Sequence, residues 1–305
     1  DMKKIQTFKR LFSYLKEHKL KLLFVILSSI VSTGFMVFAP FLIGKVTTIL
    51  LTSVRDGVFY WETIIGILVS LVALYFISQL FVFLQGYVMS KMTAKVMQTI
   101  RREINEKMHR IKLDYYDTHT HGDILSVITN DVDIINNTLS QNLTSMITQI
   151  TTAIGVLLMM ITINPILSII PIVMVPLSLF SANGVMKASE KYYYHQQELL
   201  GKLNGYIEEI YNGQDVVQTF NYQERAENHF SQLNEKLKIS SQKAETTAGA
   251  ISPITTLVND LGYVLCAAIG CFWAIAGKIT IGNVQAMLEY TWRFAEPFST
   301  IASMA

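Results

Sequence analysis

Long apolar stretches that run on into charged segments constrain the fold of this chain more than any other feature. Residues 61–87 are apolar enough to cross a bilayer, and residues 88–121 continue without Gly or Pro while they become rich in Lys, Arg and Glu. A helix whose length exceeds the thickness of the hydrocarbon layer must extend into water. Because the same design recurs over 123–163, over 165–211 and, in reverse order, over 214–276, at least four helices are expected to project beyond the lipid on one side.

The composition indicates an all-α integral membrane protein. Hydrophobic residues make up 51% of the chain and charged residues only 16%, whereas a soluble domain carries about 25% charged residues. A transmembrane helix needs about 20 apolar residues. Six stretches meet that length: 20–51, 61–87, 143–163, 165–186, 251–276 and 279–305. An even number of spans places both ends of the chain on the same side of the membrane.

The distribution of Lys and Arg predicts which side that is. Most of these residues fall into the blocks 3–21, 91–112 and 187–243, and the positive-inside rule assigns such blocks to the cytoplasm. We therefore expect a multi-pass protein of the cell membrane with both ends cytoplasmic. Its intracellular loops are expected near 88–142 and 187–250.

The segment before the first span is expected to be an amphipathic helix over residues 1–19, lying along the inner membrane surface. Its apolar residues recur at helical spacing: Phe8, Leu11, Phe12 and Leu15. The cytoplasmic extensions carry similar apolar stripes, which predict a helical bundle continuous with the membrane bundle. The stripes are Val96, Ile100, Ile104, Met108 and Ile111, then Leu125, Ile128, Val132, Ile135 and Leu139, then Phe230, Leu233 and Leu237.

Two short breaks in the extensions are the expected cytoplasmic tips. Residues 113–123 reverse the chain between the second and third spans, and residues 211–220 reverse it between the fourth and fifth. Both contain aromatic residues in a polar setting, which is typical of docking surfaces. His119 and His121 have no Cys nearby, and no metal site is expected.

These features together resemble the transmembrane domain of ATP-binding cassette exporters, in which each half has six transmembrane helices and two intracellular loops. The resemblance covers essentially all of the chain. The stretches that carry it are 115–117, 122–126, 130–133, 208–213, 216–220 and 279–284. The fold class that it implies is an all-α membrane protein with six transmembrane helices, long cytoplasmic extensions and two coupling helices, within a domain of residues 20–305.

The resemblance also implies partners and docking residues. The coupling helices would contact nucleotide-binding domains, and the fourth and fifth helices would cross to the other half of a homodimer or heterodimer. The residues implied for this coupling are Tyr115, Tyr116, Asp117 and Thr118 in the first tip, and Val216, Gln218, Thr219 and Phe220 in the second. Membrane lipid and a hydrophobic small-molecule substrate are further expected partners, and nucleic acid is not.

The motifs of an ATPase are missing from the sequence. No Gly-x-x-x-x-Gly-Lys-Ser/Thr loop or Gly-rich signature segment occurs, so no catalytic residue is expected here, and ATP and Mg would bind in a separate nucleotide-binding domain. We expect the sixth helix to be cut short at residue 305, with the ATPase domain as the natural continuation. The complete protein would then be an ATP-hydrolysing translocase.

Charged residues in the last span are candidates for the substrate cavity. Glu289, Arg293 and Glu296 share one helix face, and each charge costs about 2.5 to 3.5 kcal/mol in a membrane unless it faces water or a partner. Either they line a polar cavity, or Arg293 neutralises Glu289 or Glu296 and the group only fixes helix packing. Asp260 and Phe294 are further candidates for the same cavity.

The function that these observations favour is ATP-driven export by alternating access. A cavity with Phe, Met and a few acidic groups suits hydrophobic, often cationic, drug-like molecules taken from the cytoplasm or inner leaflet. Flipping of a lipid or lipid-linked sugar and export of a hydrophobic peptide stay open. The alternative is a gated channel or receptor in which the extensions form a cytosolic docking stalk without a transport motor.

Overall fold

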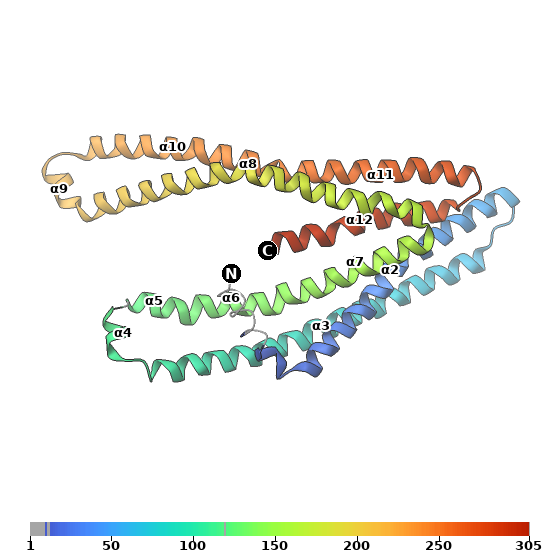
Figure 1. The fold of residues 1–305 in the computed structure, drawn as a ribbon, viewed down its shortest axis with the longest axis horizontal. Helices are drawn as coiled ribbons and strands as arrows, with labels where there is room; N and C mark the ends of the chain where they lie inside the picture. Colours follow the sequence, from blue (N-terminus) through green and yellow to red (C-terminus); the bar gives the residue numbers. More distant parts are fainter. Residues whose placement is uncertain (1–9, 11–12, 119, 305) are drawn as a thin grey trace. The chain divides into compact units, whose positions relative to one another are not determined.

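The computed structural model describes residue 10, residues 13–118 and residues 120–304, without the side chains at 113, 117, 121, 123 and 302–304. Every regular element in these ranges is a helix, in agreement with the all-α prediction (Figure 1). The helices are α2 (Lys19–Asp56), α3 (Trp61–Met108), α4 (Leu113–Thr118), α5 (His121–Ser126), η1 (Val127–Asp131), α6 (Val132–Asn137), η2 (Thr138–Asn142), α7 (Leu143–Ile163), α8 (Pro165–Asn212), α9 (Gln214–Thr219), α10 (Gln223–Gly249), α11 (Ile251–Ile275) and α12 (Ile281–Met304).

The amphipathic helix expected over residues 1–19 lies mostly outside the described residues. Of the apolar residues named for it, the structure describes Leu15 but not Phe8, Leu11 and Phe12.

Five helical stretches of the described chain are long and apolar enough to cross a membrane. They are Lys19–Asp56, Trp61–Met108, Ile124–Ile163, Pro165–Asn212 and Gln223–Ile275. The sixth predicted span forms as the helix α12, which is less apolar because it contains Glu289, Arg293 and Glu296. The chain is therefore an all-α membrane protein in which each expected span lies in a helix.

The helix α3, which contains the second span, ends earlier than the absence of Gly and Pro suggests. It stops at Met108, although no Gly or Pro interrupts residues 88–121. The backbone N–H of Arg110 donates to the carbonyl of Lys107 at 3.0 Å, a short-range bond that tightens the last turn and ends the helix. The helix therefore ends five residues before the tip expected over 113–123, which begins with the short helix α4.

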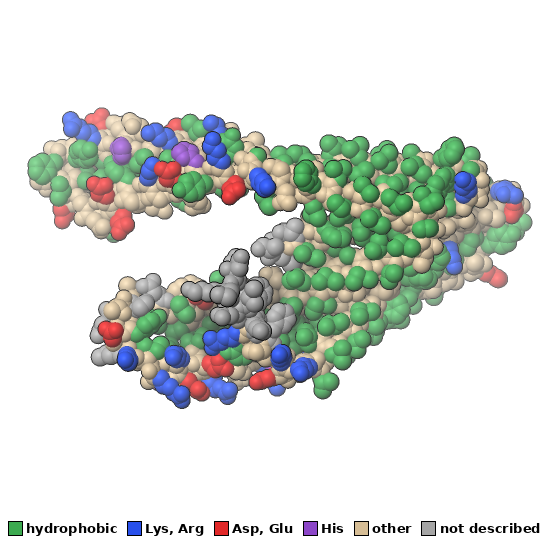
Figure 2. All heavy atoms as spheres, viewed as in Figure 1, with side chains coloured by type: hydrophobic (Ala, Val, Ile, Leu, Met, Phe, Trp, Pro, Cys, Tyr) green, Lys and Arg blue, Asp and Glu red, His purple; other side chains and the backbone are tan. Residues whose placement is uncertain are grey.

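The chain divides into two compact units, residues 1–169 with 266–305 and residues 170–265. In the first unit α2 is the central helix, because it packs against α3, α7 and α12, while α12 also packs against α7. Side chains at these contacts are fully buried, among them Val37, Val156, Met160, Met287 and Tyr290. Figure 2 shows hydrophobic side chains over the visible faces of the apolar helical stretches, as expected for surfaces that meet lipid.

Two glycines bring α2 and α12 into backbone contact. A Cβ atom added to Gly44 would lie 2.2 Å from the carbonyl oxygen of Gly282, and one added to Gly282 would lie 1.8 Å from the carbonyl oxygen of Gly44. The hydroxyl of Thr48 accepts from the N–H of Gly282 at 3.1 Å and donates to the carbonyl of Gly44 at 3.1 Å. Small residues permit this close approach, which is a common way for membrane helices to associate.

Polar side chains join other helices of the first unit within the apolar region. Ser78 on α3 donates to the carbonyl of Ser32 on α2 at 2.9 Å, and the amide of Gln85 donates to the hydroxyl of Thr148 at 3.2 Å. Ser78 and Gln85 are buried. These bonds supply partners for polar groups that lipid could not satisfy, so they fix which helix faces meet.

The apolar stripes of the first extension are buried only in part. Val96, Ile100, Val132 and Leu139 belong to one core cluster, whereas Leu125 is 60% exposed. The helix between α5 and α7 contains two π-helical turns, η1 and η2, and each holds one more residue per turn than an α-helix. These wide turns rotate the start of the helix relative to its end. The side chain of Leu125 therefore no longer lies on the same helix face as Val132 and Leu139.

The second unit is an antiparallel pair of long helices closed by the short helix α9. Leu199 and Leu203 on α8 are buried, as are Ala226 and Ala244 on α10. Leu233 and Leu237 of the predicted stripe are half-buried, and Phe230 is more exposed. The hydroxyl of Tyr206 on α8 donates to the carbonyl of Ala226 at 3.0 Å, which ties the two helices together beside α9.

Candidate functional site

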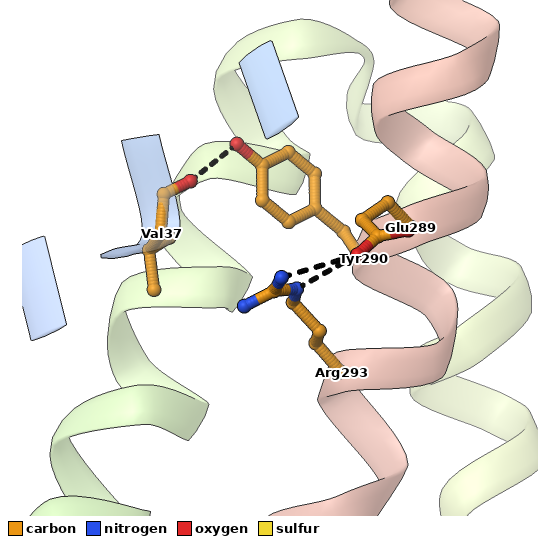
Figure 3. A network of polar contacts seen from close by, with 4 residues as sticks. All are labelled: Val37, Glu289, Tyr290 and Arg293. Atoms are coloured by element: carbon orange, nitrogen blue, oxygen red, sulfur yellow. Dashed lines mark hydrogen bonds and ion pairs between the residues drawn. The ribbon is translucent and has the colours of Figure 1, made fainter. Parts of the chain in front are cut away.

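The charged face of α12 contains one closed ion pair. Nε and Nη2 of Arg293 both donate to Oε1 of Glu289, each at 3.1 Å (Figure 3). The side chain of Arg293 is 26% exposed and that of Glu289 is 53% exposed. Of the two pairings that the sequence left open, the structure has Glu289 with Arg293.

Glu296 lies one turn further along α12 and is exposed. The ion pairs of the described residues do not include Glu296, and Arg293 is paired with Glu289. Asp260 is half-buried on α11 and belongs to the second unit. On this face of α12, Glu296 is thus a carboxylate without an ion pair to any described residue.

The aromatic residues near these charges lie on opposite sides of α12. Phe294 is 5% exposed and its ring contacts that of Phe298 at a centroid distance of 5.3 Å, which places Phe294 in the packed core of the unit. Trp292 is 49% exposed and lies on the charged side. The sequence analysis overlooked Trp292, although its position three residues after Glu289 places both on one face.

Tyr290 anchors α12 to α2 beside the ion pair. Its side chain is fully buried, and its hydroxyl donates to the carbonyl of Val37 at 2.6 Å (Figure 3). The sequence offers no sign of this bond, because Val37 and Tyr290 are 253 positions apart. The bond fixes the rotation of α12 about its axis and hence the direction in which Glu289 and Arg293 point.

Replacing Tyr290 with Phe is expected to lower the free energy of unfolding by about 1 kcal/mol, because a hydrogen bond between membrane helices contributes about 0.6 and at most about 1.7 kcal/mol. Unfolding of the purified protein in mixed micelles, titrated with a denaturing detergent, measures the change. The control is Tyr75→Phe on α3, where the hydroxyl makes none of the hydrogen bonds described. Equal midpoints for Tyr290→Phe and the unsubstituted protein would contradict the assigned bond.

The first tip is the short helix α4. Tyr115 is 40% exposed and stands edge-on to Tyr116 at a centroid distance of 6.3 Å, while the hydroxyl of Tyr116 donates to the carbonyl of Met108 at 2.9 Å. The hydroxyl of Thr118 donates to the carbonyl of Asp114 at 2.8 Å. The side chain of Asp117 lies outside the described residues. Tyr116 thus holds the tip against the end of α3, and Tyr115 beside it is partly exposed and lines the same cavity as Tyr116.

An open cavity of about 680 Å³ lies behind the first tip. Its wall is mostly apolar and includes Ile100, Ile104, Met108, Ile124, Ile128 and Tyr116. Tyr14 and Glu103 lie at its polar side, where the Tyr14 hydroxyl donates to the Glu103 carboxylate. This hydrogen bond and burial raise the pKa of Tyr14.

The second tip is the short helix α9 with its flanking residues. Tyr211, Val216 and Phe220 are 77%, 61% and 76% exposed, and Gln218 and Thr219 are exposed as well. Asn221 adopts a left-handed backbone conformation with φ 49°, which lets the N–H of Tyr222 donate to the carbonyl of Val217 at 2.9 Å. This tight turn leaves Phe220 projecting from the end of α9.

The inner side of the second tip forms a groove of about 570 Å³ between α8, α9 and α10. It is lined by Tyr206, Ile210, Val217 and Phe230 among others. Burial raises the pKa of Tyr206, whose ring also contacts His229 edge-on at 4.7 Å. The second tip thus presents exposed apolar groups on a short helix whose flanking turns are held by backbone hydrogen bonds.

The family model for the ABC transporter transmembrane region matches residues 22–294. The chain is 29% identical to the uncharacterized ABC transporter ATP-binding protein YfiC of Bacillus subtilis, over 97% of this chain and 48% of that protein. It is 33% identical to the fatty acid ABC transporter ATP-binding/permease protein of Mycobacterium bovis, over 76% of this chain and 37% of that protein. It is 24% identical to the ATP-dependent lipid A-core flippase of Aliivibrio fischeri, over 76% of this chain and 40% of that protein. The chain thus spans about half the length of the curated relatives it matches, or less.

Proposed function

Because this chain belongs to the ABC transporter transmembrane region family, we propose that it is the membrane domain of an ATP-driven exporter. The observation that carries the proposal is the pair of rigid tips, α4 and α9, at the ends of helices that continue from the membrane spans. The exposed Tyr115, Val216 and Phe220 suit contact with another domain.

That domain is proposed to be a nucleotide-binding domain, which would bind ATP and Mg. The relatives are named as ATP-binding proteins and are about two to three times as long as the stretch that this chain matches. The sequence of residues 1–305 has no phosphate-binding loop, so hydrolysis would take place in residues outside it. A second half-transporter, identical or different, would complete the cavity.

The proposed mechanism is alternating access. Closure of two nucleotide-binding domains around ATP would move α4 and α9, and the long helices would transmit this movement as levers to the bilayer. The part of α8 after Met186 is about 39 Å long at 1.5 Å per residue, so a small rotation at α9 becomes a displacement of the spans. The blocks of Lys and Arg on the extensions support a cytoplasmic location for both tips and both chain ends in the cell membrane.

The cargo is proposed to be a hydrophobic molecule, drug-like or lipidic. The relatives' names include a fatty acid and lipid A-core, which are amphiphiles with an acyl part. Glu289 on α12 is paired with Arg293, so the exposed Glu296 is the carboxylate that would favour a positive group over a negative one. Uptake from the inner leaflet would suit such molecules, since they partition into lipid.

The test uses the full-length protein reconstituted in liposomes with its nucleotide-binding domains facing outward. We expect ATP- and Mg-dependent accumulation of at least one amphiphile from a panel of a cationic dye, an uncharged dye, a fluorescent fatty acid and a fluorescent phospholipid. A non-hydrolysable ATP analogue should abolish the accumulation. ATP hydrolysis without movement of any probe, in well-folded protein, would contradict the exporter proposal.

A further inference from the structure

The cavity behind the first tip combines a long apolar wall with cationic side chains at its polar side. We propose that this cavity binds a single-chain anionic amphiphile of the long-chain carboxylate type. Its hydrocarbon chain would lie between α3 and residues 124–135, and its carboxylate would meet Lys107 and Arg10. This site lies outside the apolar spans, so it is separate from the route of an exported cargo.

The apolar wall is elongated. Figure 1 shows residues 124–135 beside the end of α3, to which α4 joins them. From Ile100 to Ile111 the wall extends about 16 Å along α3, and the volume of about 680 Å³ lies within the range of small-molecule sites. A long space bounded by two helices suits a hydrocarbon chain. The apolar residues that line it are Ile100, Ile104, Met108, Ile111, Ile124, Val127, Ile128 and Ile135.

The cavity is built against a packed core. Ile104 and Ile135 from its wall pack against the buried cluster that contains Leu15. Leu15 is 2% exposed, and the adjacent Tyr14 donates a hydrogen bond to Glu103 on α3. These contacts fix the segment before α2 beside the cavity, and so they fix the position of its polar side.

The charged lining residues decide the sign of the head group. They are Arg10, Glu103 and Lys107, two cations and one carboxylate. The carboxylate of Glu103 already accepts the hydrogen bond of Tyr14. A carboxylate on the ligand could accept charge-assisted hydrogen bonds from Lys107 and Arg10, whereas an ammonium group would be repelled by both. The lining therefore favours an anionic head group.

The position of the cavity along α3 decides between a dispersed amphiphile and a bilayer lipid. Ile100 lies 13 residues, or about 20 Å, beyond Tyr87, where the apolar stretch of this helix ends. A phospholipid would have to withdraw both chains from the bilayer to reach the cavity. A single-chain carboxylate leaves the bilayer more easily, because every methylene adds to the free energy needed to enter water.

The experiment uses the full-length protein in nanodiscs and a hexadecanoic acid with a photoreactive diazirine on its chain. After illumination, peptide mass spectrometry should find the label within residues 100–111 or 124–135. Unlabelled hexadecanoate should prevent this labelling at a concentration about tenfold lower than hexadecyltrimethylammonium does. Label confined to the apolar spans, or equal competition by the two amphiphiles, would overturn the proposal.

Two substitutions of opposite charge effect test the head-group contact. Lys107→Met is expected to raise about fivefold the hexadecanoate concentration that halves the labelling, and Glu103→Gln should lower it about threefold. Lys95→Met is the matched control, because Lys95 is exposed on α3 and does not line the cavity. Equal shifts in Lys107→Met and Lys95→Met would overturn the assigned contact.

A substitution in the wall tests where the chain lies. Ile128→Trp adds volume from the side that faces α3, so it should remove the label from residues 100–111. Ile104→Phe makes a smaller addition from α3 and should weaken the labelling. Both variants are compared as monodisperse fractions from size-exclusion chromatography. Undiminished labelling in either variant would place the chain elsewhere and overturn the proposal.

Occupancy of the cavity should affect the first tip, because Tyr115 and Tyr116 of α4 line it. Saturating hexadecanoate is expected to shift the ATP concentration for half-maximal hydrolysis about fivefold in the unsubstituted protein and less in Lys107→Met. This consequence rests on the proposed function. Specific labelling without any shift would contradict the link to ATP hydrolysis and support the binding site alone.

Other occupants would give different results. A phospholipid with a diazirine on one chain is expected to label residues near Tyr87, and label from it in the cavity would assign the site to bilayer lipid. Label from hexadecanoic acid that appears only after residues 1–9 are deleted would show that this segment occupies the cavity. Either result overturns the proposal. Failure to export any amphiphile contradicts the exporter proposal and does not alter the labelling expected here.

Discussion

Replacing Phe220 with Ala is expected to uncouple ATP hydrolysis from transport, reducing the amount of cargo moved per ATP about tenfold or more. Phe220 projects from the end of α9 with 76% of its surface exposed, so the fold does not depend on it. An aromatic anchor at the centre of a docking surface typically contributes about 2 kcal/mol or more to association. Its loss should let the nucleotide-binding domains close without moving α9.

The measurement is the ratio of transport to ATPase rates in liposomes, with thermal stability of the purified protein recorded in parallel. Tyr194→Ala is the matched control, because Tyr194 is 78% exposed and lies on α8, well before the end of that helix at α9. The conservative variant Phe220→Trp should retain coupling. An unchanged ratio in Phe220→Ala would show that α9 does not dock through this side chain.

Replacing Gly44 with Ala is expected to destabilise the first unit by about 3 kcal/mol, near the upper end of the usual cost of overpacking a core. The added Cβ would lie 2.2 Å from the carbonyl oxygen of Gly282, and neither backbone can rotate away as a side chain could. The helices α2 and α12 must therefore separate, which also breaks the hydrogen bond between Thr48 and the Gly282 N–H. Gly282→Ala should have a similar or larger effect.

The change is measured as the temperature at which half of the detergent-solubilised protein is lost from the monodisperse peak in size-exclusion chromatography. Gly34→Ala is a control on the same helix, because a Cβ built at Gly34 has no atom within 4 Å beyond its chain neighbours and the adjacent helix backbone. This control should be neutral or slightly stabilising, since Ala favours the helix over Gly. Equal heat resistance of Gly44→Ala and Gly34→Ala would contradict the close contact.

The positions of the spans could be predicted well from the sequence, because they depend on local hydropathy. The third span was expected at 143–163 and forms as Leu143–Ile163, and the start of the fourth at residue 165 was also correct. The ends of the extensions were less predictable. The end of α3 at Met108 depends on a tight turn in a sequence without Gly or Pro, and nothing in the local pattern marks it.

The sequence predicts where the candidate site lies, but it does not predict which charged residues pair there. The spacing of Glu289, Arg293 and Glu296 predicts a shared face, yet both pairings of Arg293 are compatible with helical geometry. The choice depends on side-chain rotamers, and the direction of the face depends on the bond between Tyr290 and Val37. Contacts between distant positions, such as Gly44 with Gly282, leave no trace in a single sequence.

The two π-helical turns have a consequence for how the length of this loop can vary among related chains. Each wide turn accommodates one residue more than an α-helix of the same rise, so deleting a single residue from Thr138–Asn142 would restore a regular helix rather than break the chain. Such a deletion would rotate the whole segment before it and turn α4 to a different side. A related chain with a one-residue gap at this point should therefore expose a different set of residues on α4. Its tip would then suit a partner surface of different shape.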